Sequence, residues 1–82
     1  MRPSTMLKRY RTISAFSHNV EYSSQEIEMV SQIYSQGTTV SKEKTKELSS
    51  LGHGPITSAL SFRNTFLLQT ADGGEIVIQA ED

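Results

Sequence analysis

The sequence predicts an α+β fold with an N-terminal strand, two to three short helices and a C-terminal β-hairpin. Three patterns carry this prediction: apolar and polar residues alternate near the N-terminus, a capping signal precedes an apolar stripe of helical period, and two β-rich runs flank paired glycines. Since 82 residues are too few for two independent cores, we expect a single small domain over residues 10–82, after a flexible basic arm at 1–9.

The first predicted element is a strand over residues 11–21. Successive side chains of a strand point to opposite faces, so apolar residues at every second position indicate one buried face. The even positions carry Phe16, His18, Val20 and Tyr22, while the positions between them are polar.

A helix is predicted over residues 24–36. Ser23 and Glu26 have the spacing of a capping box, in which each side chain accepts a hydrogen bond from the other's backbone amide. Gly37 stands where a left-handed residue often ends a helix. One face of this helix is apolar and consists of Ile27, Val30, Ile33 and Tyr34.

The middle of the chain predicts a second helix, capped by Ser41 and ending near Ser50, and then a break at 52–55. Pro55 suits the first position of a short third helix over 55–63, with Ile56, Ala59 and Leu60 on its buried side. Residues 56–62 also fit a strand, so both interpretations stay open.

A hairpin is predicted over residues 65–79 around Asp72-Gly73-Gly74, since the glycines supply the positive φ of a tight turn. Its apolar side chains lie on both faces, and an unpaired hairpin edge accepts a further strand. The predicted partner-binding residues are Phe66, Leu68, Ile76 and Ile78. The alternative is core packing, with one face against helix 24–36 and the other against strand 11–21.

The order helix, helix, helix, hairpin is similar to that of winged helix-turn-helix domains. This resemblance implies that 55–63 is a recognition helix, which would present Arg63 and Asn64 to base edges. Leu48 and Ser58 depart from the small and apolar residues expected around a turn at Gly52.

Charge is divided unevenly along a chain whose net charge is −1. The first twenty residues hold four cations and no acid, while the rest hold four cations and all nine acids. The cations of the arm are Arg2, Lys8, Arg9 and Arg11, which we predict to contact DNA phosphates. The alternative is an ordinary polar tail.

Catalytic and metal sites are not indicated. The chain has no cysteine, its histidines are far apart, and no nucleophile or phosphate-binding motif occurs. We therefore expect a protein that is not an enzyme and needs no metal or other cofactor. Apolar runs of at most three residues are far shorter than a membrane span, and we expect a cytoplasmic location.

In length, split charge and basic arm, the chain resembles the Lxc (Bof) type of phage corepressor, a small protein that strengthens a repressor already bound to its operator. The resemblance implies a partner repressor, weak or no DNA binding alone, and added phosphate contacts from Arg2, Lys8, Arg9 and Arg11. The hairpin edge or strand 11–21 would then bind the repressor. Two alternatives remain: an autonomous winged-helix DNA-binding protein, and a stoichiometric inhibitor of a host enzyme.

Overall fold

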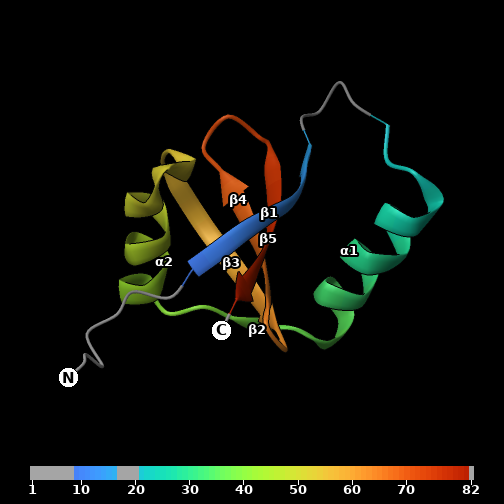
Figure 1. Ribbon diagram of the computed structural model, residues 1–82, viewed down its shortest axis with the longest axis horizontal. Coiled ribbons are helices and arrows are strands. Elements are labelled where there is room, and N and C mark those ends of the chain that lie inside the picture. The colour runs from blue at the N-terminus through green and yellow to red at the C-terminus, as the bar shows by residue number, and fades with distance from the viewer. Residues whose placement is uncertain (1–8, 17–20, 82) are drawn as a thin grey trace.

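The computed structural model describes residues 9–16 and 21–81 (Figure 1). Five strands, two α-helices and one π-helical turn follow one another along these residues. In chain order they are β1 (Arg9–Phe16), α1 (Ser24–Gln36), β2 (Thr38–Thr39), α2 (Lys42–Leu48), the π-helical turn η1 (Ser49–His53), β3 (Ile56–Phe62), β4 (Thr65–Thr70) and β5 (Glu75–Glu81). The fold is therefore α+β, as the sequence predicts.

The strands form one antiparallel sheet in the order β1-β5-β4-β3-β2. Strands β3, β4 and β5 form a meander, and the N-terminal strand β1 adds to its far side against β5. Tyr10 pairs with Ala80 and Phe16 with Glu75, with a bulge at Ile13 between the pairs of Thr12 and Ser14. The first and last described strands are thus neighbours.

The two helices cover opposite faces of this sheet, so the molecule has three layers (Figure 1). Side chains alternate between faces along a strand. Leu67 and Val77 therefore pack against α1, while their neighbours Leu68 and Ile78 pack against α2. Burial on both faces explains why the hairpin strands carry unbroken apolar runs.

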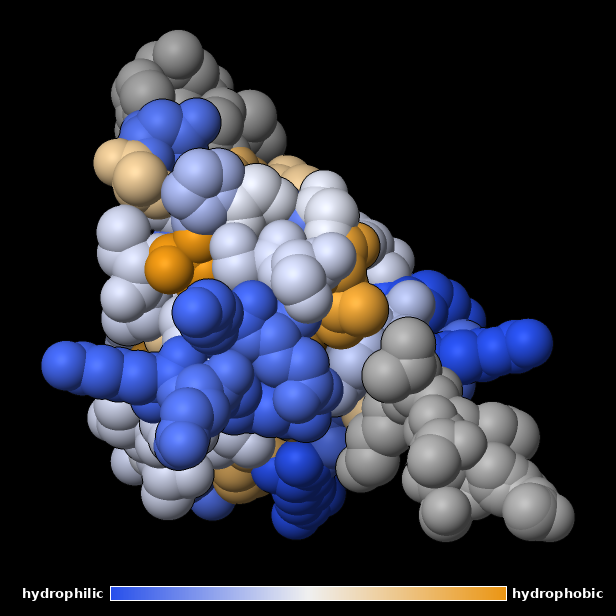
Figure 2. All heavy atoms as spheres, turned by 90° about the vertical axis from the view of Figure 1, so that its left-hand side faces the viewer, coloured by the Kyte–Doolittle hydropathy of each residue, from blue (hydrophilic) through white to orange (hydrophobic). Residues whose placement is uncertain are grey.

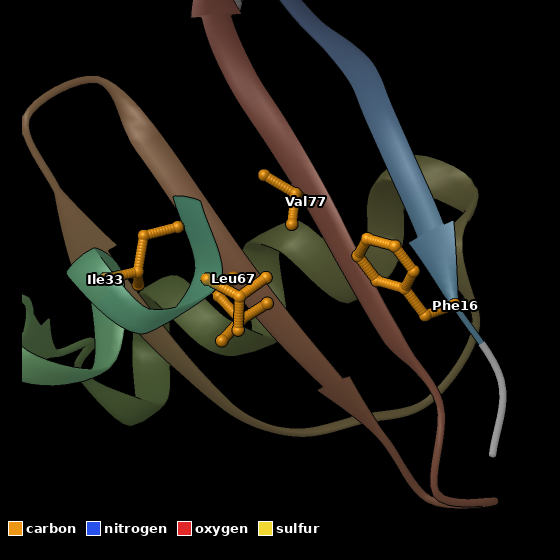
Figure 3. Packing of buried hydrophobic residues seen from close by; sticks show 5 residues of the cluster. Phe16, Ile33, Leu67 and Val77 are labelled. Atoms are coloured by element: carbon orange, nitrogen blue, oxygen red, sulfur yellow. The ribbon is translucent and has the colours of Figure 1, made fainter. Parts of the chain in front are cut away.

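Each face has its own core cluster. Under α1, Ile33 meets Leu67, Val77 and Phe16 from three neighbouring strands (Figure 3). Under α2, Leu48 packs against three sheet residues, which are Ala59, Leu68 and Ile78. Complete burial of a large aliphatic side chain contributes roughly 1.5–3 kcal/mol, so these clusters are the main source of stability.

Helix α1 confirms the predicted 24–36 range and the predicted cap. The Glu26 amide donates to Ser23 Oγ at 3.2 Å and the Ser23 amide donates to Glu26 Oε1 at 2.8 Å. The prediction of a left-handed Gly37 is wrong, because its φ of −79° and ψ of 167° are extended and lead directly into β2. Glycine is needed there for space, since a Cβ would lie 2.4 Å from the Ile33 carbonyl oxygen.

The N-terminal strand is offset from its predicted 11–21 range. It begins earlier, at Arg9, because pairing with β5 extends to Glu81. Residues 17–20, including His18 and Val20, lie outside the described part of the chain. Tyr22 is not in a strand, because it immediately precedes the Ser23 cap, but its ring still packs on Phe16 with centroids 4.0 Å apart.

The predicted third helix over 55–63 is wrong, and the strand interpretation of 56–62 is correct. Strand β3 pairs with β4, with a register shift between Ile56 and Ser58, and buries Ala59 beneath α2; both are long-range contacts. The second helix has its predicted Ser41 cap but ends at Leu48. The chain continues in η1 to His53, and Gly52 within this turn has a φ of 96°. Without a recognition helix, the described chain lacks the winged-helix order of elements.

The predicted hairpin is confirmed, although β5 continues two residues beyond the predicted end at 79. Gly73 has the expected positive φ, at 89°, whereas Gly74 does not. The Gly74 amide donates to Thr70 Oγ1 at 2.9 Å. Neither helix in the described ranges is long and apolar enough to traverse a bilayer.

Candidate functional site

Four of the six predicted DNA-binding residues lie at one end of the sheet, which we call the basic end: Arg9, Arg11, Arg63 and Asn64. Strand register places them there, because Arg9 pairs with Glu81 and Thr65 pairs with Gln79. The Ala80 amide also donates to the Asn64 carbonyl at 2.8 Å, which ties the β3–β4 turn to the end of β5. Arg2 and Lys8 lie outside the described residues.

The Arg11 side chain is exposed and only weakly held. Its Nη2 donates to Gln79 Oε1 at 3.0 Å, and its Nε lies 3.8 Å from a Glu81 carboxylate oxygen. Its side chain is 64% exposed and that of Glu81 is 45% exposed. Such solvated pairs contribute at most about 1 kcal/mol. A phosphate can therefore replace Glu81 as the partner of Arg11 at little cost.

Arg63 is held in an unusual backbone conformation on the two-residue connection between β3 and β4. Its φ of 57° is the only positive value for a non-glycine residue in the described chain. A residue with a Cβ costs roughly 1–2 kcal/mol in this region. The guanidinium carbon lies 5.1 Å from the Phe62 ring centroid, so stacking on that ring orients the cation.

The structure places the predicted partner-binding residues in the core beneath α2. Leu68 and Ile78 are fully buried, and Phe66 and Ile76 pack against the same cluster. The prediction of a free hairpin edge is wrong, because β1 pairs with β5 and β3 pairs with β4. The core-packing alternative is correct, except that α2, and not strand 11–21, covers the second face.

Strand β1 is the long edge strand of the sheet. No strand within residues 9–16 and 21–81 pairs with its outer side. Thr12, Ile13 and Ala15 are exposed, and the Ile13 side chain at the bulge is 41% exposed. An edge of this kind presents amide and carbonyl groups to another chain. The same strand begins at the basic end, so one element carries both features.

A cluster that sequence reasoning missed joins α1 to the sheet. Tyr22 and Tyr34 both donate hydrogen bonds to the Glu75 carboxylate, and Gln69 Nε2 donates to the Tyr34 hydroxyl at 2.8 Å. Burial is the largest cause that raises the pKa of Tyr22 to about 12, and the hydrogen bond to Glu75 is the second. The same two causes also raise the pKa of Tyr34. Both phenols therefore stay protonated and act as clamps. Their positions in sequence gave no signal of this contact.

The remaining acidic and histidine side chains of the described residues form no metal-binding cluster. Across the described ranges, no three His, Cys, Asp or Glu side chains are grouped so that they could hold a metal ion. His53 lies in η1 and lines a hollow of about 450 Å³ beside Pro55 and Ile76. Asp72, which also lines this hollow, accepts hydrogen bonds from the Thr70 hydroxyl and the Gly74 amide, and these stabilise the hairpin turn.

Comparisons with models of protein families, with curated protein sequences and with solved structures give no significant match.

Proposed function

We propose that this chain is a small, non-enzymatic transcription regulator that binds a partner repressor and strengthens its hold on operator DNA. The observation that carries the proposal is the basic end, where Arg9, Arg11 and Arg63 gather although two of them are more than fifty positions from the third. The proposed action is in the cytoplasm, where operator DNA is found.

The number of cations argues for an accessory contact. Each neutralised phosphate adds about 0.9 to the slope of log affinity against log salt. Three arginines, even with the cations of the N-terminal segment, make too few contacts for tight binding at physiological salt. Another protein therefore supplies most of the affinity, and this chain adds its contacts to DNA phosphates once that protein is on the DNA.

Strand β1 supports a specific mode of attachment to the repressor. Its outer edge can take a strand of the repressor by main-chain hydrogen bonds. A repressor held there would have the arginines of the basic end next to it, because Arg9 and Arg11 belong to the same strand. The corepressor thus needs no recognition helix of its own.

The first test is duplex-DNA binding by the purified protein alone, at roughly 50 and 200 mM salt. The proposal expects weak binding at the lower salt and none at the higher. Tight binding that persists at the higher salt would show an autonomous DNA-binding protein and contradict the proposal.

The second test identifies the partner. A photoreactive residue in place of Ile13 should cross-link a sequence-specific DNA-binding protein in the native cells. Substitution of Lys8, Arg9 and Arg11 by Ala should keep this cross-link but weaken the stimulation of operator binding. Cross-linking to an enzyme, with inhibition that the alanine variant retains in full, would instead establish the stoichiometric inhibitor.

A further inference from the structure

A groove separates α2 from the N-terminal half of β3, at the end of β3 that lies away from Arg63. Its volume is about 620 Å³. Val40 and Ile56 contribute apolar surface, Thr45 and Thr57 contribute hydroxyls, and Lys42 and Lys46 contribute charge. No acidic side chain of the described chain lines it. We call it the α2–β3 groove.

Its two lysines form no ion pair within residues 9–16 and 21–81. Lys42 and Lys46 are exposed and form no ion pair with any described residue, whereas Lys44, on another side of α2, contacts Glu47 at 3.2 Å. Positions four apart on a helix lie one above the other, roughly 6 Å apart. Figure 2 looks onto α2 and shows strongly hydrophilic residues gathered over it. The groove therefore offers a pair of solvated cations at a fixed spacing.

The other wall of the groove is an open sheet edge. Strand β2 pairs with β3 only at Leu60 and Ser61, and the Val40 amide adds one bond to the Ala59 carbonyl at 2.9 Å. Beyond this point, the outer side of residues 56–58 meets no strand of the described chain. This short edge is where another strand can continue the line that β2 begins.

We propose that the α2–β3 groove binds an extended acidic peptide segment that continues β2 along residues 56–58 of β3. Side chains two apart on a strand share a face and are separated by roughly 7 Å. This matches the spacing of Lys42 and Lys46. The segment therefore carries two carboxylates at alternate positions, one for each lysine.

A peptide fits this groove better than a nucleic acid. The sheet edge offers main-chain hydrogen bonds in the pattern of a second strand, which a sugar-phosphate chain cannot match. The groove lining includes no aromatic ring on which a base could stack. The inference stands apart from the proposed function, since it uses neither the basic end nor the edge of β1.

The test uses two synthetic octapeptides of identical composition. One carries Glu at two alternate positions among Thr and Val, and the other carries the two Glu residues side by side. In ¹⁵N-labelled protein, the first peptide should shift the amides of residues 56–58 and 42–46, and should slow hydrogen exchange at 56–58. The second should bind several-fold more weakly, because one carboxylate faces away from α2.

Matched variants locate the contact. The Lys42→Gln/Lys46→Gln double variant should weaken binding of the first peptide about five- to tenfold, while Arg63→Gly, which removes a cation beyond the opposite end of β3, should leave its affinity unchanged. The proposal is overturned by any of three results. These are no amide shift at roughly 2 mM peptide, equal binding to the double variant, or tighter binding of a single-stranded oligonucleotide at the same amides.

Discussion

Tyr10 carries the one buried side-chain polar atom that has no hydrogen-bond partner within the described residues. Its ring packs edge-on against Phe66 with centroids 5.8 Å apart, and Lys44 Nζ lies 5.7 Å from its centroid. The hydroxyl, followed by Glu47, raises the pKa of Lys44. No described group completes a hydrogen bond with this hydroxyl, so the water that it lost on burial is not replaced.

Tyr10→Phe should therefore stabilise the protein. An unsatisfied buried hydroxyl costs about 1–3 kcal/mol, whereas Lys44 keeps Glu47 and the two rings after the substitution. We expect the free energy of unfolding to rise by about 1 kcal/mol, measured by urea denaturation at neutral pH. A decrease of similar size would mean that the hydroxyl is bonded in solution.

The Tyr22–Glu75 contact predicts a loss of stability at high pH. The folded pKa of about 12 is above the ordinary value of 10.0, so the unfolded state loses this proton first as pH rises. The stabilising effect is complete below pH 10 and disappears as pH approaches 12. The melting temperature of the wild type should fall across this window more steeply than that of Tyr22→Phe. Parallel curves for the two proteins would exclude the clamp.

At the scale of the element, the position of helix α2 on the sheet depends on a single large side chain. Leu48 is fully buried and connects this seven-residue helix to Ala59, Leu68 and Ile78, whereas Leu51, one turn later, is 38% exposed. A helix this short has little stability of its own. Its position, and with it the α2–β3 groove, thus rests on one contact.

Leu48→Ala should cost about 2–5 kcal/mol, as large buried truncations do. Leu51→Ala should cost less than about 1 kcal/mol, because its side chain is already partly in water. Urea unfolding of both variants measures the difference. Similar losses for the two would show that α2 is held by contacts other than the Leu48 cluster.

The elements that the sequence predicted correctly are those defined by neighbours in the chain. The Ser23 and Ser41 caps need only residues three positions away, and the hairpin needs only its glycine turn and flanking runs. Residues of β3 were instead predicted to form a helix. Their strand conformation is set by pairing with β4 and by burial beneath α2. By themselves, these residues fit either state.

At the scale of the whole molecule, only part of the candidate site could be predicted from the sequence. The basic residues stand out in the sequence, but only the sheet register shows that Arg63 joins Arg9 and Arg11. The hairpin residues Leu68 and Ile78 were misassigned to a partner because apolar runs do not reveal which layer covers them. Tyr22, Tyr34 and Glu75 meet only after folding.

In the proposed function, the basic end adds phosphate contacts to a repressor–operator complex. The most direct test of this role measures the operator affinity of the partner repressor, once cross-linking has identified it, at about 150 mM salt. The repressor is measured with the wild-type chain and with the variant Arg9→Gln/Arg11→Gln/Arg63→Gly. The Gly substitution suits this test, since it relieves the positive φ of Arg63. The wild type should tighten binding about tenfold or more and steepen the salt slope by about 2.7 for three phosphates, and the variant should lose most of both effects. Equal stimulation by the two proteins, or none by either, would contradict the account.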